Sequence, residues 1–519
     1  MAKTTHIAIV SSPGFSHLVP IVEFTKRLIN LHPNFHVTCI VPSLGSPQES
    51  SKAYLKTLPS NIDSIFLPPI SKEKLPQGVV YPGLLIQYTV TLSLPSIHEV
   101  LKSLSSKAPL TALVVDVFAF QTLEFAKEFN SLSYFYFPSS AMTLSLTLHL
   151  PRLDEEVSGE YKDLKEPIKL PGCVPLLGVD LPAPTQNRSS EAYKSSLERA
   201  KAVSLADGII MNTFLEMESG AIRALDEFGN GKIRFHPVGP ITQKGSSNEV
   251  DECLRWLDRQ PPCSVLYVSF GSGGTLSQQQ INELAWGLEL SCQRFLWVLR
   301  APSNSSGAAY LENTNEDPLQ FLPNGFLERT KEKGLVVPSW APQVQVLNHK
   351  SVGGFLSHCG WNSVLESMQE GVPLITWPLF AEQKMNAVLL VVALKVALRP
   401  KFNEDGIVDK EEIAKVTKCL MVEEEGKGLR ERINNLKDYA VNALRDGFST
   451  QTLSKLASEW ENFATITARS SAHVATTANT VKRPSAADEL HLRGVRNLHR
   501  DQHVNNLRRL PLHERRRHR

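Results

Sequence analysis

Residues 340–383 read WAPQVQVLNHKSVGGFLSHCGWNSVLESMQEGVPLITWPLFAEQ, and this stretch predicts a strand–helix–strand unit. Residues 354–358 predict a buried strand, and a helix is expected from about Asn362. Gly371 and Pro373 mark the end of that helix, and the apolar run at 374–377 predicts the next strand. A βαβ unit of this kind indicates an α/β fold.

The helix of such a unit points its N-terminus at the carboxyl end of the sheet, where unpaired N–H groups and the helix dipole favour an anion. His358 ends the preceding strand. Asn362 and Ser363 supply donors in the first helical turn, and Glu366 lies one turn further on the same face. These residues predict a site for a diphosphate.

Other side chains of the stretch suit the rest of a nucleotide sugar. Trp340 is placed to stack on a flat base, and Glu382 and Gln383 are suited to bind sugar hydroxyl groups. A single tryptophan, such as Trp361 or Trp377, is more often a core residue. The prediction of a nucleotide-sugar site therefore depends on the joint pattern.

A candidate general base lies near the start of the chain. Residues 6–11 predict a buried strand, 12–14 (SPG) a turn, and the residues that follow a helix with His17 in its first turn. The apolar run at 112–117 predicts a second strand with Asp116 at its end. A neutral imidazole that a carboxylate orients is a good base near neutral pH. The alternative is that each residue only caps the helix that follows it.

Composition and length favour a large globular protein with more than one domain. The 519 residues are 42% hydrophobic, which allows two to four domains, and two large α/β domains fit best. The seven cysteines are scattered and form no CxxC pair, which suits a reducing cytoplasmic compartment. No leader is expected, and no apolar run approaches the roughly 20 residues that span a bilayer.

The last residues, 464–519, differ from the rest. They carry a net charge of +8, against −6 for residues 1–463, and contain no aromatic residue. Such a segment cannot bury enough apolar surface to fold alone, so we expect a disordered tail. The alternative, a basic arm for nucleic acid or anionic membranes, is weakened by the lack of stacking aromatics.

The stretch at 340–383 resembles the signature box of plant UDP-dependent glycosyltransferases. It matches that box in length and at Trp340, Gln343, His358, Trp361, Asn362, Ser363, Glu366, Glu382 and Gln383. The rest of the sequence resembles the branch of hydroquinone (arbutin-forming) and monolignol glucosyltransferases. The segments that carry this resemblance include FGSGGTLS, LPGCVP, RFLWVLR, GFLERT and AEQKMNAVLL. The resemblance covers roughly residues 1–463.

The resemblance implies a GT-B type fold, in which two Rossmann-like domains face each other across a cleft. We expect an acceptor-binding domain at 1–243, a linker at 244–252 and a UDP-sugar-binding domain at 253–445. A C-terminal helix at 446–463 is expected to return to the first domain, ahead of the tail at 464–519.

The resemblance also implies inverting, metal-independent transfer of glucose from UDP-glucose to a small phenol, without a cofactor. His17 is the implied base and Asp116 the carboxylate that orients it. The implied donor-binding residues are Ser272, Trp340, Ala341, Gln343, His358, Trp361, Asn362, Ser363, Glu366, Glu382 and Gln383, and Gln383 is more typical of glucose users than of galactose users. Phe118, Met142, Leu146 and Leu181 are candidates for the acceptor pocket.

Other functions remain open at this point. A nicotinamide-dependent Rossmann enzyme is disfavoured because the turn at 271–274 (GSGG) lacks the GxGxxG spacing. A sugar-nucleotide-binding protein without catalysis is disfavoured because His17 and Asp116 are present. A different UDP-sugar remains possible. We expect a monomer that binds neither nucleic acid nor a membrane.

Overall fold

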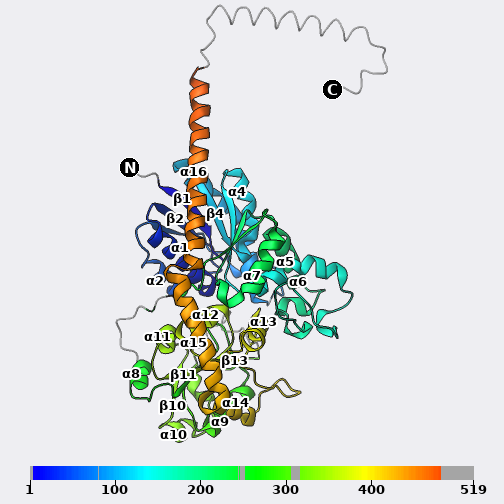
Figure 1. Ribbon diagram of the computed structural model, residues 1–519, viewed down its shortest axis with the longest axis vertical. Coiled ribbons are helices and arrows are strands. Elements are labelled where there is room, and N and C mark those ends of the chain that lie inside the picture. The colour runs from blue at the N-terminus through cyan, green and yellow to red at the C-terminus, as the bar shows by residue number, and fades with distance from the viewer. Residues whose placement is uncertain (1–3, 80, 244, 246–251, 305–315, 481–519) are drawn as a thin grey trace, which may run out of the picture. The chain divides into compact units, whose positions relative to one another are not determined.

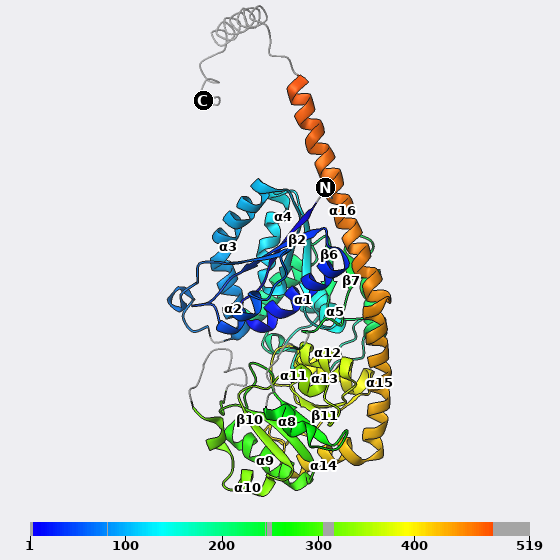
Figure 2. The ribbon, with the colours of Figure 1, turned by 90° about the vertical axis from the view of Figure 1, so that its left-hand side faces the viewer.

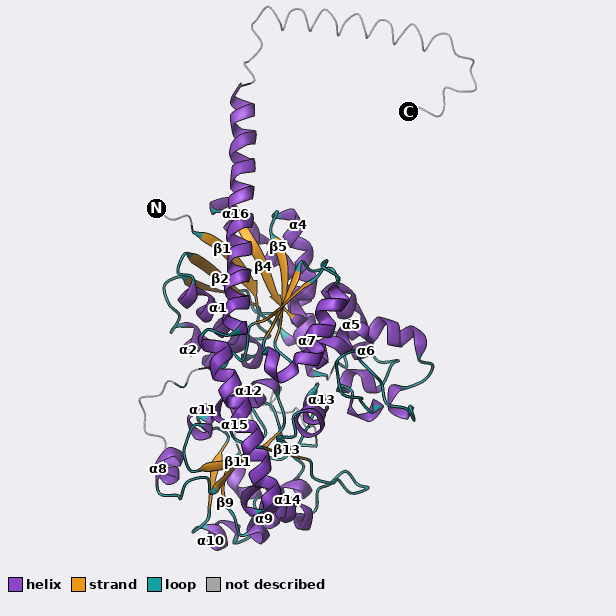
Figure 3. Ribbon diagram, viewed as in Figure 1, coloured by secondary structure: helices purple, strands orange, loops and turns teal. Residues whose placement is uncertain are grey.

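The computed structural model describes residues 4–79, 81–243, 245, 252–304 and 316–480 (Figure 1). By its internal contacts the chain forms two units, Met1–Glu461 and Asn462–Arg519. The first unit contains two parallel sheets with helices around them, so the predicted α/β class is confirmed (Figure 3). In the described part of the chain, no helix is both long and apolar enough to cross a membrane.

The first sheet has seven parallel strands in the order β3-β2-β1-β4-β5-β6-β7. Their bounds are β1 (Thr5–Val10), β2 (Phe35–Val41), β3 (Ile62–Phe66), β4 (Leu110–Asp116), β5 (Leu132–Phe137), β6 (Gly208–Met211) and β7 (Arg234–Pro237). The strand order reverses between β1 and β4. In open α/β sheets, ligands bind outside the carboxyl ends of the strands at such a reversal.

Helices cover both faces of this sheet (Figure 2). They are α1 (Phe15–Leu31), α2 (Glu49–Leu55), α3 (Pro82–Lys107), α4 (Glu124–Glu128), α5 (Ala141–Glu156), α6 (Glu191–Val203) and α7 (Leu215–Gly229), with a short 3-10 segment η2 (Val117–Leu123) after β4. Alternate residues of β1 enter different cores: Ile7 and Ile9 pack on one face, and Ala8 and Val10 on the other. A strand buried on both faces explains its continuous apolar run.

The second sheet repeats this plan with six strands in the order β10-β9-β8-β11-β12-β13. Its strands are β8 (Val265–Ser269), β9 (Arg294–Leu299), β10 (Gly334–Pro338), β11 (Val352–Ser357), β12 (Leu374–Thr376) and β13 (Ala397–Leu398). Its helices are α8 (Glu252–Asp258), α9 (Gln278–Ser291), α10 (Phe326–Thr330), α11 (Gln343–Leu347), α12 (Trp361–Glu370), α13 (Gln383–Val388), α14 (Lys410–Val422) and α15 (Glu424–Arg445). The reversal here lies between β8 and β11.

The predicted βαβ unit is present as β11, α12 and β12, with β11 pairing in parallel with both β8 and β12. Gly371 ends α12 in the left-handed conformation, with φ of 71°. This conformation favours glycine, which explains the stop signal in the sequence.

Two findings bear on the expected domain boundaries. The first unit has two halves, one built on the first sheet and one on the second. One core cluster joins them, because Met142 and Leu146 of α5 belong to the same cluster as Trp361 and Val364 of α12. Apart from Gly245 and Glu252, the expected linker at 244–252 lies outside the described residues.

The last helix, α16 (Phe448–Thr480), packs its first turns on the first sheet. Trp460 is fully buried, with its ring 5.2 Å from that of Tyr134. Arg27 of α1 donates to the carbonyl oxygen of Leu444, in the last turn of α15. α16 was expected to end at 463, but it continues to Thr480 as a regular helix; the remaining tail, 481–519, lies outside the described residues.

Candidate active site

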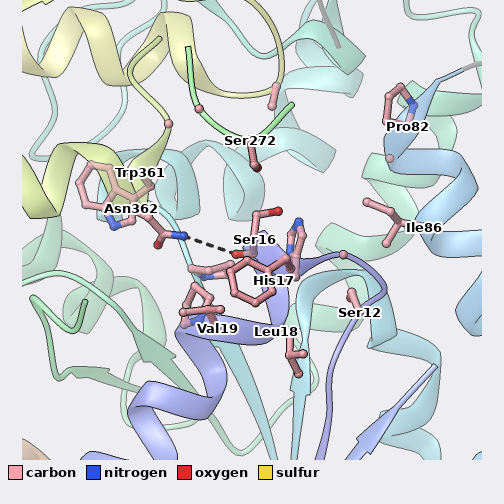
Figure 4. A pocket seen from close by; sticks show the side chains of 18 of the residues that line it. Ser12, Ser16, His17, Leu18, Val19, Pro82, Ile86, Ser272, Trp361 and Asn362 are labelled. Carbon is pink, nitrogen blue, oxygen red and sulfur yellow. Dashed lines mark hydrogen bonds between the residues drawn. The ribbon is translucent and has the colours of Figure 1, made fainter. Parts of the chain in front are cut away.

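A cavity of about 1060 Å³ lies within the first unit and is lined by residues from both halves (Figure 4). Its walls include the loops that follow β1, β4, β8 and β11, the four strands at the two reversals. Both sheets therefore direct the carboxyl ends of their strands at one space. Most of the predicted site residues line this cavity.

His17 lies in the first turn of α1, and its Nδ1 atom is 3.1 Å from Oδ2 of Asp116, which ends β4. Asp116 is fully buried, and its other carboxylate oxygen accepts hydrogen bonds from the Ser12 hydroxyl and from Phe118 N. Because a carboxylate only accepts, Nδ1 of His17 carries the proton of this contact. Nε2 is thereby left to accept a proton from a ligand.

Burial works to lower the pKa of His17, but the charge and hydrogen bond of Asp116 raise it by more. The carboxylate of Glu382 adds to this effect, and the guanidinium of Arg199 opposes it. The net result is a pKa above the ordinary value of 6.5. A base of this kind holds a proton more firmly than a free imidazole does.

His358 follows β11 and is held between two glycines. A Cβ atom on Gly271 would lie 2.5 Å from its ring, and one on Gly360 would lie 2.4 Å away. Burial lowers the pKa of His358 to about 4, so the ring is neutral at neutral pH. Its Nδ1 atom is buried and has no hydrogen-bond partner. Ser272, next to Gly271, is exposed at the same wall of the cavity.

The N-terminus of α12 also faces the cavity. Gly360 caps it without a side-chain hydrogen bond, so the first N–H groups of the helix receive no cap. Asn362 donates from Nδ2 to the carbonyl oxygen of Ser16 at 3.4 Å (Figure 4). At the place where the sequence predicts an anion site, the structure has an uncapped helix N-terminus beside a neutral imidazole and an exposed hydroxyl.

A hydrogen-bonded group further along α12 involves Gln343, Ser363 and Glu366. Nε2 of Gln343 donates to Ser363 Oγ at 2.8 Å and to Glu366 Oε2 at 2.7 Å. Burial raises the pKa of Glu366 to about 7, although the bond from Gln343 works to lower it. Trp340 stands at the cavity edge with 64% of its surface exposed, and Ala341 beside it is buried.

Two residues of the signature stretch make hydrogen bonds within the protein. Trp361 is only 3% exposed, and its indole N–H donates to the carbonyl oxygen of Asn212 at 2.7 Å. Gln383 is 3% exposed, and its Oε1 accepts from the backbone N–H groups of Leu379 and Phe380. Trp361 is therefore a bridge between the halves, and Gln383 has only its amide nitrogen left for a ligand.

The acceptor candidates divide into two pairs. Phe118 and Leu146 line the cavity, and the Phe118 ring is 5.2 Å from that of His17. Met142 and Leu181 do not line it, because both are buried in the core that joins the halves. Which face of an apolar segment meets the cavity depends on packing, which periodicity does not reveal.

Sequence reasoning missed several residues of the cavity wall. Tyr81 and Arg199 line it beside Phe118, Ser139 donates to Glu382 Oε1 at 3.2 Å, and Tyr267 lies near Gln343. Ser190 caps α6 in the usual way, so this helix could have been predicted, but not that its Arg199 points at the cavity.

Comparisons with known proteins agree with this geometry. Residues 247–403 match a model of the family described as UDP-glucoronosyl and UDP-glucosyl transferase. The chain is 50% identical to hydroquinone glucosyltransferase of Rauvolfia serpentina, over 89% of this chain and 99% of that protein. It is equally 50% identical to UDP-glycosyltransferase 72B1 of Arabidopsis thaliana, over 89% of this chain and 97% of that one.

Solved structures give the same result. UGT2 of Phytolacca americana, complexed with UDP-2fluoro-glucose and pterostilbene, is similar with a TM-score of 0.82 and 47% identity, over 88% of this chain and 100% of that one. A UDP-glucosyltransferase of Polygonum tinctorium capable of glucosylating indoxyl, in complex with 3,4-dichloroaniline, has a TM-score of 0.83 and 48% identity, over 89% and 99%.

Proposed function

The chain belongs to the plant UDP-glycosyltransferases, in the branch of hydroquinone glucosyltransferase, and we propose that it transfers glucose from UDP-glucose to a hydroxyl group of a small phenol. The observation that carries the proposal is the pairing of His17 with the buried carboxylate of Asp116, because His17 lines the same cavity as His358 and the α12 N-terminus. The similarity to a hydroquinone glucosyltransferase and to a structure complexed with UDP-2fluoro-glucose and pterostilbene supports this choice of substrates.

The proposed reaction is a single displacement at the anomeric carbon of glucose. Nε2 of His17 takes the proton of the phenol as the phenolic oxygen forms a bond to that carbon. The bond between the carbon and the UDP oxygen breaks, and UDP leaves with the electron pair from the opposite face. An α-linked donor thus yields a β-glucoside. Asp116 stabilises the imidazolium that forms and holds the ring in its tautomer.

The charge that develops on the leaving diphosphate meets fixed donors. We assign this role to Nε2 of neutral His358, the hydroxyl of Ser272 and the uncapped N–H groups of α12, since all three groups line the cavity. We propose that these groups act without a metal ion or other cofactor. Since they are fixed before the reaction, they need little reorganisation when the charge appears.

Other residues of the second half orient the donor. Trp340 is proposed to stack on the uracil ring beside Ala341, and Glu366, held by Gln343, to accept from the ribose hydroxyl groups. Glu382 and the free amide nitrogen of Gln383 are proposed to bind the glucose. We also propose that the protein selects UDP-glucose among the UDP-sugars.

The proposed working state is a monomer in the cytoplasm, where the seven free cysteines suit reducing conditions.

The test is direct. The purified full chain is incubated with UDP-glucose and hydroquinone, and products are separated by mass while UDP is measured. We expect one hexose added per phenol and one UDP released per glucoside. UDP-sugar binding without transfer to any phenol in a panel would instead identify a binding protein, and faster transfer from UDP-galactose would overturn the donor assignment.

A further inference from the structure

Arg199 of α6 places a positive charge in the acceptor side of the cavity. Its guanidinium carbon lies 4.9 Å from the centre of the Phe118 ring, and that ring is 5.2 Å from the ring of His17. All three side chains line the cavity. The cation and the base therefore border one space, with Phe118 next to both.

The hydrogen-bonding capacity of Arg199 is largely unused. Nη2 donates to the Ser196 hydroxyl at 3.0 Å, whereas a guanidinium has five N–H donors. Within the described residues, Arg199 forms no ion pair. The carboxylates near this part of the cavity are engaged elsewhere, Asp116 with His17 and Ser12, and Glu382 with Ser139.

A partly buried cation without an ion pair lowers the stability of the fold unless an anion binds to it. Burial lowers the pKa of Arg199, while Tyr81 and Asp116 act to raise it, and a guanidinium remains charged at neutral pH. Arg188 shows the contrasting arrangement: it lies outside the cavity lining, and its Nη2 is 2.8 Å from Asp154 Oδ1. The unpaired cation is thus the one that faces the acceptor.

We infer that Arg199 binds an anionic group of the acceptor, so that the preferred phenols carry a carboxylate at the end opposite the reacting hydroxyl. This inference rests on the proposed function and refines its substrate class. In this arrangement the hydroxyl meets Nε2 of His17, the aromatic ring lies against Phe118 and the carboxylate meets the planar fork of Arg199, which matches a carboxylate with two parallel hydrogen bonds.

The orientation also specifies the product. With the carboxylate held at Arg199, only the phenolic oxygen reaches the anomeric carbon, its proton passes to His17, and UDP leaves with the electron pair of the broken bond. The product is therefore a phenolic glucoside, which is stable to mild alkali. The reverse orientation would give a glucose ester, which mild alkali hydrolyses.

The experiment compares three acceptors: 4-hydroxybenzoate, its neutral methyl ester and hydroquinone. For the wild type, kcat/KM for the acid should exceed that for the ester by about 10- to 100-fold, the range of a charge-assisted hydrogen bond. In Arg199→Gln the ratio of acid to ester should fall toward one. Arg199→Lys, which keeps the charge and loses the fork, should give an intermediate ratio. Lys201→Gln, on the same helix but exposed, should leave the ratio as in the wild type.

Binding can be measured apart from catalysis with 4-methoxybenzoate, which has the carboxylate but no free hydroxyl. It should inhibit the transfer to hydroquinone competitively, and Arg199→Gln should raise its inhibition constant by about tenfold. An unchanged constant, an acid-to-ester ratio that Arg199→Gln leaves unaltered, or an ester product would overturn the inference. Wild-type protein that uses hydroquinone but rejects the acid would overturn it while the proposed function stands; transfer to none of the three would refute the proposed function itself.

Discussion

Nδ2 of Asn362 lies 3.4 Å from the carbonyl oxygen of Ser16, so the first turn of α12 is hydrogen-bonded to the residue that precedes His17. One end of this contact belongs to the proposed diphosphate site and the other to the proposed base. The link spans 346 residues of sequence. It links α12 to the first turn of α1, and the proposed displacement at one carbon atom requires such a defined position of donor and base.

The first prediction concerns the pair of His17 and Asp116. His17→Ala should lower kcat by about 10²- to 10⁴-fold, because a general base contributes that much. Asp116→Asn should also lower kcat strongly, since an amide cannot stabilise the imidazolium as a carboxylate does. The kcat of both variants is measured as the rate of UDP release with hydroquinone as the acceptor. His98→Ala, whose histidine pairs with Glu128 on the surface, is the matched control and should keep wild-type kcat. Full activity of His17→Ala would refute the mechanism.

The second prediction concerns pH. The base must be neutral to act, and the pKa of His17 is raised above 6.5 by Asp116 and Glu382 against burial and Arg199. At saturating UDP-glucose, kcat/KM for hydroquinone should therefore rise with pH through a midpoint above 6.5. In Asp116→Asn the carboxylate that raises the pKa of His17 is lost, while burial still lowers that pKa. The midpoint should therefore move to lower pH. A midpoint that stays in place would show that another group controls the rate.

The same shift has a consequence for stability. Because the folded-state pKa is raised, the protonated His17 stabilises the fold fully below the unfolded value of about 6.5, and this stabilisation is lost as pH rises through the folded pKa. Asp116→Asn should remove that part of the pH dependence of the melting temperature.

The third prediction concerns the glycine beside His358. Gly271→Ala places a Cβ atom 2.5 Å from the imidazole, so the ring must move from the proposed diphosphate site. UDP affinity should fall by about tenfold or more. Gly406→Ala is the matched control, since both glycines have φ of 74° but Gly406 has nothing within 4 Å. Both variants should lose some stability in thermal melts, and only Gly271→Ala should weaken UDP binding in calorimetry.

The fourth prediction compares two tryptophans of one stretch. Trp340→Ala should raise the dissociation constant of UDP by about 10- to 100-fold, the range of base stacking, with little change in melting temperature because the side chain is exposed. Trp361→Ala should lower the free energy of unfolding by about 3–5 kcal/mol, because it removes a buried ring and its hydrogen bond to Asn212. Similar effects of both variants on stability would contradict the assigned roles.

Much of the fold could be predicted because its signals are local. The strand and helix at 352–370 follow from hydrophobic periodicity, and Gly371 from the conformation that ends the helix. The resemblance to plant UDP-glycosyltransferases, based on a joint pattern of residues, is confirmed by the relatives. The roles of single residues were harder to predict: Met142 and Leu181 lie in the core, and Arg199 was missed.

The sequence alone thus identified two strand–turn–helix segments. One carries His17 in the first turn of its helix, and the other carries His358 after its strand, ahead of the N-terminus of α12. The tertiary structure alone brings His17 to Asp116 across 99 residues, leaves Trp340 exposed while Trp361 is buried, and places Arg199 in the wall of the cavity. The reason is geometric. Parallel strands gather the ends of distant segments at one edge of a sheet, and the packing of one half against the other selects which face of each segment meets the cavity.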